Sequence, residues 1–236
     1  MANPYFQFKQ FTVWHDKCAM KVGTDGVLLG AWADLSEATR VLDVGTGTGL
    51  IALMLAQRSD KTVRITALDI DADAALQATE NADRSPWKER IEVVKADFKD
   101  FETEQPFDLI VSNPPYFVNS LQCPDKQRTT ARHTDSLPFD NLLEHSTHLL
   151  TERGRLALII PTEVWPLVER CATNHGLYPH RVVKVVTTPG ATPKRMLVCF
   201  HRHAGECIEQ QLLVEKSRHV YSDEFTALAK DFYLKL

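Results

Sequence analysis

The chain has 236 residues, of which 44% are hydrophobic and 25% are charged, and its formal net charge is −4 at pH 7. These proportions are those of a soluble globular protein with one sizeable core. The acidic balance by itself argues against a strongly nucleic-acid-binding protein. No stretch approaches eighteen uninterrupted apolar residues, so a membrane span is not expected.

The five cysteines are scattered, and none lies in a Cys-x-x-Cys pair, so neither a disulfide framework nor a zinc site is indicated. Two histidine pairs, His145 with His148 and His201 with His203, lack a carboxylate or cysteine that would complete a metal site. The N-terminus has no basic region followed by an apolar one, so it is not a secretory signal. We therefore expect no metal, reduced thiols and a cytoplasmic location.

The order of patterns along the chain predicts an α/β fold. Residues 1–36 are expected to form an extension that packs as a lid on a single domain spanning 37–236, with a helix beginning near Thr24. Strands are expected at 40–44, 63–68, 91–96, 107–112, 155–160, 182–187 and 196–201, and helices at 50–56, 71–81, 139–150 and 162–175. This alternation predicts a mostly parallel sheet with helices on both faces, closed by a hairpin.

A glycine-rich turn follows the first of these strands. Gly45, Gly47 and Gly49 separate the strand from an apolar helix, an arrangement in which the backbone can approach a ligand closely. The spacing differs from the dinucleotide fingerprint, which places its third glycine one residue later. Asp43 stands two residues before the first glycine, where a carboxylate suits an ammonium or sulfonium group and would repel a pyrophosphate.

Two further carboxylates follow the next two strands. Asp69 is placed to accept the hydroxyls of a ribose, and Asp97 could accept an exocyclic amine of an adenine. Each acid alone could equally be a solvated or helix-capping aspartate. Their repetition at successive strand ends, together with Asp43, is more informative, because these ends form the ligand crevice of an open parallel sheet.

The strand at 107–112 ends in Asn113, Pro114, Pro115 and Tyr116. The asparagine oxygen can accept one N–H of a planar amino group, and a carbonyl of the Pro-Pro turn can accept the other. Neither proline offers a competing backbone donor. Tyr116 can stack on the ring that carries the amine, and Phe117 could close its other face. The alternative is a rigid turn that merely contains proline.

Residues 43–49, Asp69, Asp97 and 113–116 resemble the class I S-adenosylmethionine-dependent methyltransferases that modify amino nitrogens. Residues 8–11, 20–32 and 221–234 resemble the bacterial tRNA1(Val) adenine-37 N6-methyltransferases, so the likeness spans nearly the whole chain. The resemblance implies a Rossmann-like fold with a seven-stranded sheet, S-adenosylmethionine as cofactor and tRNA as partner, with no obligate protein partner. It implies that the catalytic residues are Asn113, Pro114 and Tyr116, and that the cofactor is bound by Asp43, Gly45, Gly47, Gly49, Asp69, Asp97 and Asn113.

Substrate contacts are expected in two basic segments as well as at the aromatic residues. The first segment lies in the long polar connection at 117–136, and the second lies between residues 178 and 203, around the closing hairpin. Clustered cations could hold a phosphate backbone, although a solvated face is their usual role. The expected substrate-binding residues are Pro115, Tyr116, Phe117, Lys126, Arg128, Arg132, Lys194 and Arg195.

Several rival functions share part of this pattern. An rRNA adenine or guanine amino-methyltransferase would have the same core, and so would a protein glutamine N5-methyltransferase. The latter carries a helical N-terminal domain, for which about 36 residues before the first core strand are too few. A non-catalytic RNA-binding module is disfavoured by the intact motif residues. An NAD-dependent oxidoreductase is disfavoured by the glycine spacing and by Asp43.

Overall fold

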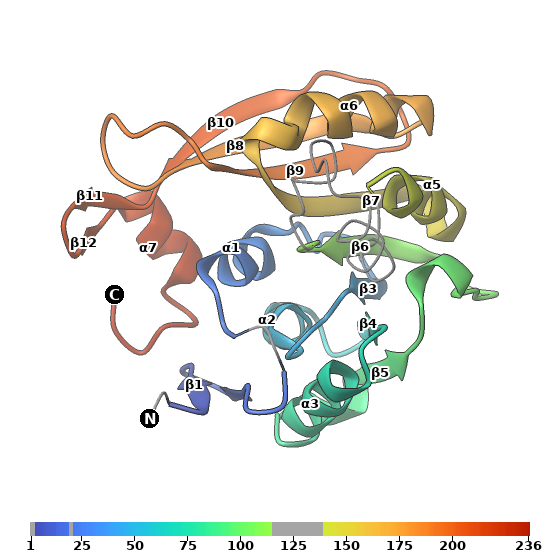
Figure 1. Cartoon of the computed structure of the whole chain (residues 1–236), viewed down its shortest axis with the longest axis horizontal. Helices are drawn as coiled ribbons and strands as arrows, with labels where there is room; N and C mark the ends of the chain where they lie inside the picture. Colours follow the sequence, from blue (N-terminus) through green and yellow to red (C-terminus); the bar gives the residue numbers. More distant parts are fainter. Residues whose placement is uncertain (1–2, 19–20, 115–138) are drawn as a thin grey trace, which may run out of the picture.

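The computed structural model describes residues 3–18, 21–114 and 139–236, and within them an eight-stranded sheet is covered by helices on both faces (Figure 1). Across the sheet the strands are β10 (Ile208–Leu213), β8 (Tyr178–Val186), β9 (Arg195–His201), β7 (Leu150–Pro161), β6 (Phe107–Ser112), β3 (Arg40–Val44), β4 (Arg64–Asp69) and β5 (Ile91–Lys95). The helices are α1 (Thr24–Trp32), α2 (Leu50–Arg58), α3 (Ala72–Asp83), α5 (Phe139–Leu149), α6 (Trp165–Asn174) and α7 (Asp223–Ala229).

The central strands β7, β6, β3, β4 and β5 are all parallel to their neighbours within this group. Asp43 pairs in register with Ala67 on one side and Val111 on the other. Because parallel strands end at the same edge of a sheet, the turns after β3, β4, β5 and β6 share one rim. This confirms the expected parallel core.

The remaining part of the sheet is mixed. Strand β9 runs antiparallel to both β7 and β8, which is the expected hairpin. All seven expected strands are present, and β10 adds an eighth by pairing parallel with β8. Little in the sequence pointed to β10, because its first four residues are exposed and lack the alternation of a half-buried strand. Strands β11 (Glu215–Ser217) and β12 (Val220–Tyr221) form a separate antiparallel pair.

Two hydrophobic clusters lie on the two faces of the sheet. Alternate residues of β7 point to opposite faces, so Ile159 belongs to the first cluster while Leu158 and Ile160 belong to the second. Helices α1, α2 and α7 cover the first cluster, and α5 and α6 cover the second (Figure 1). Within the described residues, no helix combines the length and apolar character needed to cross a membrane.

The N-terminal residues are part of the first cluster. Strands β1 (Tyr5–Gln7) and β2 (Thr12–Trp14) form a small antiparallel hairpin that was not expected from the sequence. Phe8 is buried and stacks on Phe11 with 4.7 Å between ring centroids. The backbone N–H of Lys9 donates to the Phe232 carbonyl at 2.8 Å, so this hairpin meets the C-terminal segment.

One expected boundary was wrong. The strand expected at 155–160 already begins at Leu150, so residues 151–154, which were expected to lie between the helix and this strand, are inside β7. The pairing of β6 with β7 shifts register here, from Phe107 opposite Leu150 to Leu109 opposite Arg155. Gly154 permits this irregularity, because a Cβ there would lie 2.8 Å from Leu150 Cδ2.

Candidate active site

The turn between β3 and α2 is built on left-handed glycines. Gly45, Gly47 and Gly49 all have positive φ angles, of 70°, 57° and 79°. The backbone N–H groups of Gly45 and Thr46 donate to the Leu68 carbonyl at 2.8 and 2.9 Å, which fastens the turn to the end of β4. The turn therefore presents its backbone at the shared rim with no side chain at its three glycine positions.

Asp43 lies fully buried beneath this turn. Its Oδ2 accepts hydrogen bonds from the Thr46 hydroxyl at 2.6 Å and from the Ala52 N–H at 3.2 Å. Its Oδ1 has no partner among the described residues. Burial raises the pKa of Asp43 to about 7, and the nearby carboxylate of Asp69 adds to this effect. A buried carboxylate with one unpaired oxygen fits a cationic group of a bound ligand.

Asp69 organises the same turn. Its Oδ2 accepts from the Gly47 N–H at 2.7 Å, and its Oδ1 accepts from the Asp71 N–H at 3.0 Å. From the sequence we expected contacts with ligand hydroxyls or a solvated or helix-capping role, so this support of the loop was missed. Each carboxylate oxygen can accept a second hydrogen bond, and a role toward hydroxyls remains compatible with the geometry.

Asp97 stands at the same rim beyond β5. It caps the short 3₁₀ turn η2 (Phe98–Asp100) by accepting from the Lys99 N–H at 3.0 Å through Oδ1. This is the capping role that the sequence left open as an alternative. The residue is only partly buried, and its Oδ2 lies outside this cap, so Asp97 can also face a ligand.

Asn113 and Pro114 follow directly on β6, the strand next to β3. Asn113 is partly buried and Pro114 is buried. The Ser112 hydroxyl donates to the Val44 carbonyl at 2.8 Å, which joins the ends of β6 and β3 just before their two turns. The glycine turn and residues 113–114 are thus neighbours, as expected for segments that follow adjacent parallel strands. Of the expected substrate-binding residues, Pro115, Tyr116, Phe117, Lys126, Arg128 and Arg132 lie outside the described residues.

Lys194 directly precedes β9, and Arg195 is the first residue of that strand. Because β9 is antiparallel to β7, this end of the strand is at the same rim as the carboxyl ends of the parallel strands. Lys194 is exposed, whereas Arg195 donates through Nε to Asp25 Oδ2 at 2.8 Å. This ion pair ties the first turn of α1 to the sheet.

The other basic residues of the 178–203 segment do not form one patch. Arg202 donates to the carbonyls of Thr147 and Leu150, at 3.0 and 3.1 Å. The Arg181 guanidinium lies 5.2 Å from the centre of the Trp32 ring. These two cations lie toward the opposite rim from Lys194, so the expected clustering of cations in this segment was wrong for them.

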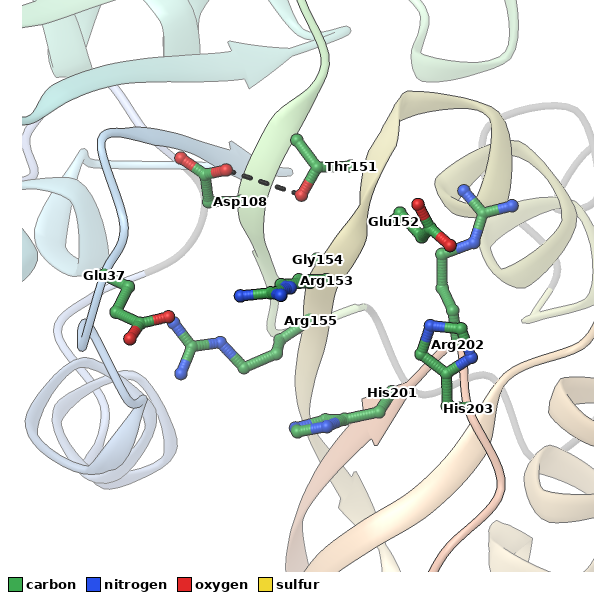
Figure 2. Close-up of a pocket in the computed structure, with 10 residues that line it drawn as sticks. All are labelled: Glu37, Asp108, Thr151, Glu152, Arg153, Gly154, Arg155, His201, Arg202 and His203. Atoms are coloured by element: carbon green, nitrogen blue, oxygen red, sulfur yellow. Dashed lines mark hydrogen bonds between the residues drawn. The ribbon is translucent and has the colours of Figure 1, made fainter.

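A pocket of about 620 Å³ lies at that opposite rim (Figure 2). Two of its charged side chains are engaged with the protein itself: Asp108 accepts from the N–H groups of Thr39 and Arg40, and Arg155 forms an ion pair with Asp34 at 2.5 Å. The pKa of His201 falls to about 4, mainly through burial and also through the adjacent His180 and Arg155. The lining residues are Glu37, Asp108, Thr151, Glu152, Arg153, Gly154, Arg155, His201, Arg202 and His203.

The sequence analysis did not single out Gln77 and Asn81, two polar residues on α3 whose side chains are buried, with exposures of 0% and 1%. They stand four residues apart, on the helix face that also carries the buried Ala74 and Ala78. A polar side chain on the buried face of a helix needs a hydrogen-bond partner. Two polar residues four apart on an otherwise apolar helix face were therefore the feature of the sequence that could have pointed to them. No group of three or more potential metal ligands occurs within the described ranges.

Residues 23–165 match the family described as the methyltransferase small domain. The chain is 58% identical to the tRNA1(Val) (adenine(37)-N6)-methyltransferase of Bacteroides thetaiotaomicron, over the full length of both proteins. It is 46% identical to the protein of that name from Tolumonas auensis, over 100% of this chain and 99% of the relative. The chain belongs to the family of tRNA1(Val) (adenine(37)-N6)-methyltransferases. The family expected from the sequence, and with it the class of enzyme, is confirmed.

Solved structures confirm the expected class I methyltransferase fold. A predicted O-methyltransferase from Agrobacterium tumefaciens aligns with a TM-score of 0.69 over 88% of this chain and 96% of its own, at 20% sequence identity. TrmN from Thermus thermophilus aligns with a TM-score of 0.52 over 70% of this chain and 44% of its own, at 26% identity. The fold is therefore shared well beyond the relatives of high sequence identity.

Proposed function

We propose that this enzyme transfers a methyl group from S-adenosylmethionine to the exocyclic N6 amine of adenine 37 in a valine tRNA. The observation that carries the proposal is that the glycine turn and Asn113-Pro114 follow directly on adjacent parallel strands. The relatives that share this chain over its whole length bear the name of that activity.

The residues around the glycine turn fit this cofactor. When bound, S-adenosylmethionine supplies a methyl group on a sulfonium centre that is already activated for transfer. The unpaired Oδ1 of Asp43 is suited to the ammonium of its amino-acid part. Asp69 and Asp97 would accept from the ribose hydroxyls and the adenine amine, and the glycines would leave room for close approach.

The Asn-Pro turn fits the acceptor amine. The Asn113 side-chain oxygen and a carbonyl of the Pro-Pro turn would accept its two protons and favour a pyramidal nitrogen whose lone pair is available. The same two acceptors would stabilise the positive charge that develops on nitrogen as the N–C bond forms and the bond between the methyl carbon and sulfur breaks, which leaves the sulfur as a neutral thioether. One amine proton then leaves to solvent, so no dedicated base is required before attack. Stacking on Tyr116 and Phe117 would contribute roughly 1–3 kcal/mol per base.

The RNA backbone is expected to contact the basic residues Lys126, Arg128, Arg132, Lys194 and Arg195. Of the two in the described part of the chain, Lys194 is the stronger candidate because its side chain is exposed, whereas Arg195 is committed to Asp25. Lysine contacts with phosphate add affinity and position the RNA without reading its sequence.

The decisive variant is Asn113→Ala. It should abolish methylation of a valine tRNA transcript while S-adenosylmethionine still binds by calorimetry, because the amide that would hold the amine is removed while the carboxylates and glycines of the cofactor site are kept. Asn174→Ala, at an exposed position at the end of α6, is the matched control and should retain activity. Near-normal turnover of Asn113→Ala would contradict the proposed role.

The RNA target is tested separately by mass spectrometry of nucleosides from a deletion strain. Loss of N6-methyladenosine from one tRNA would support the proposal, whereas loss confined to rRNA would favour the rRNA alternative. Methylation of a protein glutamine by the purified enzyme would favour the remaining alternative.

A further inference from the structure

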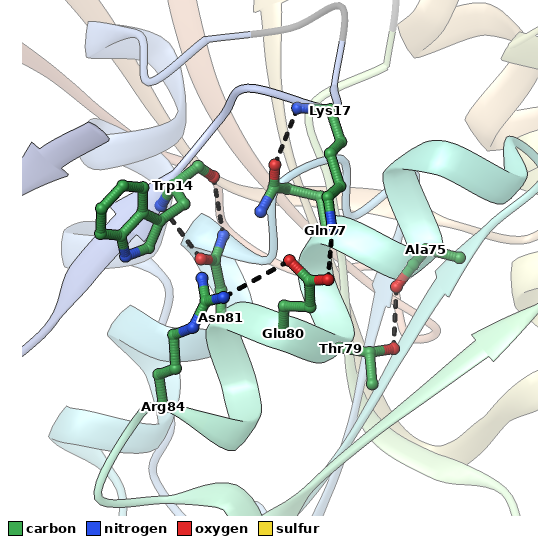
Figure 3. A network of polar contacts seen from close by, with 8 residues as sticks. All are labelled: Trp14, Lys17, Ala75, Gln77, Thr79, Glu80, Asn81 and Arg84. Carbon is green, nitrogen blue, oxygen red and sulfur yellow. Dashed lines mark hydrogen bonds and ion pairs between the residues drawn. The ribbon is translucent and has the colours of Figure 1, made fainter. Parts of the chain in front are cut away.

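The N-terminal segment 14–18 is held against the glycine turn by side chains of α3 (Figure 3). Asn81 is the centre of this arrangement. Its Oδ1 accepts from the Trp14 N–H at 3.0 Å, and its Nδ2 donates to the Trp14 carbonyl at 2.8 Å and to the Thr48 carbonyl at 2.9 Å. One buried amide therefore joins the N-terminal segment to the glycine turn directly.

Gln77 fixes the same segment one helical turn earlier. Its Oε1 accepts from the Lys17 N–H at 3.0 Å. The Lys17 ammonium also forms an ion pair with Glu80, and the Arg84 guanidinium lies 5.5 Å from the centre of the Trp14 ring. Trp14 and Lys17 are thus both attached to α3. Some of these contacts come from the buried face of the helix and others from its more exposed face.

These contacts bring the segment onto the turn itself. A Cβ placed on Gly47 would lie 3.9 Å from the Cys18 sulfur, so the thiol stands close to this glycine. A Cβ placed on Gly49 would lie 3.4 Å from the Cα of Ala78, so α3 also abuts the turn. The segment, the helix and the turn are consequently packed as one unit at the candidate cofactor site.

We propose that Asn81 and Gln77 are positioning residues that hold segment 14–18 on the glycine turn as one wall of the cofactor site. Neither residue has a place in the methyl-transfer chemistry. Their hydrogen bonds go to backbone groups, so their loss would release the segment while the acceptor turn at Asn113 stays in place. This inference rests on the proposed binding of S-adenosylmethionine at the turn.

The role predicts a specific kinetic effect. Asn81→Asp keeps the acceptor for the Trp14 N–H but cannot donate to the two carbonyls. We expect the KM for S-adenosylmethionine to rise about tenfold, with kcat changed less than about threefold. Gln77→Met removes the acceptor of the Lys17 N–H at similar volume and should raise this KM less. Thr79→Ala, at an exposed position of the same helix, is the control and should match the wild type.

Cys18 provides a readout independent of activity. Alkylation of the intact enzyme by N-ethylmaleimide, mapped by peptide mass spectrometry, should be slowed at Cys18 by S-adenosylmethionine. Without cofactor it should be about tenfold faster at Cys18 in Asn81→Asp than in the wild type, because the segment is released. An unchanged KM and an unchanged alkylation rate in folded Asn81→Asp and Gln77→Met would overturn the inference.

The two proposals fail in different ways. If the wild type binds S-adenosylmethionine and protects Cys18 but does not methylate tRNA, the RNA target is wrong and the positioning role stands. If the wild type binds S-adenosylmethionine without protecting Cys18, the positioning role is wrong while the activity stands. If calorimetry detects no binding to the wild type, both are overturned.

Discussion

Replacing Asp43 by asparagine should make the cofactor-free enzyme relatively more stable at alkaline pH while weakening cofactor binding. The introduced amide can keep its oxygen where Asp43 Oδ2 now accepts from Thr46 and Ala52. The substitution removes the negative charge, which in the wild type is fully buried and has one oxygen without a partner among the described residues. The variant therefore separates the destabilisation caused by burying a negative charge from the stabilisation by the hydrogen bonds that Oδ2 accepts within the turn.

The sign and size follow from the pKa of Asp43, which burial raises to about 7 from an ordinary value of 3.8. The folded state holds this proton more tightly than the unfolded state, so ionisation destabilises the fold. The penalty is absent below about pH 4, grows by about 1.4 kcal/mol per pH unit up to about pH 7, and is constant above it. It reaches about 4 kcal/mol, of which about 3 kcal/mol accumulates between about pH 5 and pH 8.

Urea unfolding without cofactor, at about pH 5 and pH 8, measures this directly. The difference in free energy of unfolding between Asp43→Asn and wild type should grow by about 3 kcal/mol over that range. The new amide group adds a cost of about 1–3 kcal/mol that does not depend on pH. Asp73→Asn, which alters an exposed carboxylate of α3, serves as control. A difference that stays constant between the two pH values would refute the reasoning.

Two further predictions concern other parts of the sheet. Gly154→Ala should lower the free energy of unfolding by about 1–3 kcal/mol in urea titrations, because its Cβ would lie 2.8 Å from Leu150 Cδ2 and 2.9 Å from the Thr151 carbonyl oxygen; an unchanged midpoint would contradict the close packing. Lys194→Ala should raise the KM for tRNA and reduce the salt dependence of binding by about one unit of slope. The control is Lys184→Ala. The Lys184 ammonium pairs with Glu209 at 3.1 Å, and its loss should leave the KM for tRNA and the salt dependence unchanged.

The site was predictable where local sequence pattern determines position. Parallel strands must end at one rim, so recognising the strands before Asp43, Asp69 and Asn113 was enough to bring these residues to one edge. No such rule connects Asp25 with Arg195, which meet only because α1 packs near the start of β9. Contacts of that kind depend on the tertiary arrangement.

The fold, too, was predictable where local sequence determines it and not where it depends on tertiary contacts. The buried strands were found from their continuous apolar runs, whereas β10 pairs through its backbone with side chains largely in solvent. The early start of β7 depends on a register shift that Gly154 allows and that no periodicity indicates. Asn81 was overlooked because its three partners are backbone groups distant in sequence.

The contact between the N-terminal hairpin and the end of the chain has a consequence for biosynthesis. The Lys9 N–H bonds the carbonyl of Phe232, and Phe8 lies against Tyr233 with 5.8 Å between ring centroids. During translation the hairpin is made well before Phe232 and Tyr233, so it can complete these contacts only after those residues have followed. The segment over the glycine turn continues directly from that hairpin. The hairpin that leads into the segment on the glycine turn therefore completes its packing only after Phe232 and Tyr233 have been synthesised.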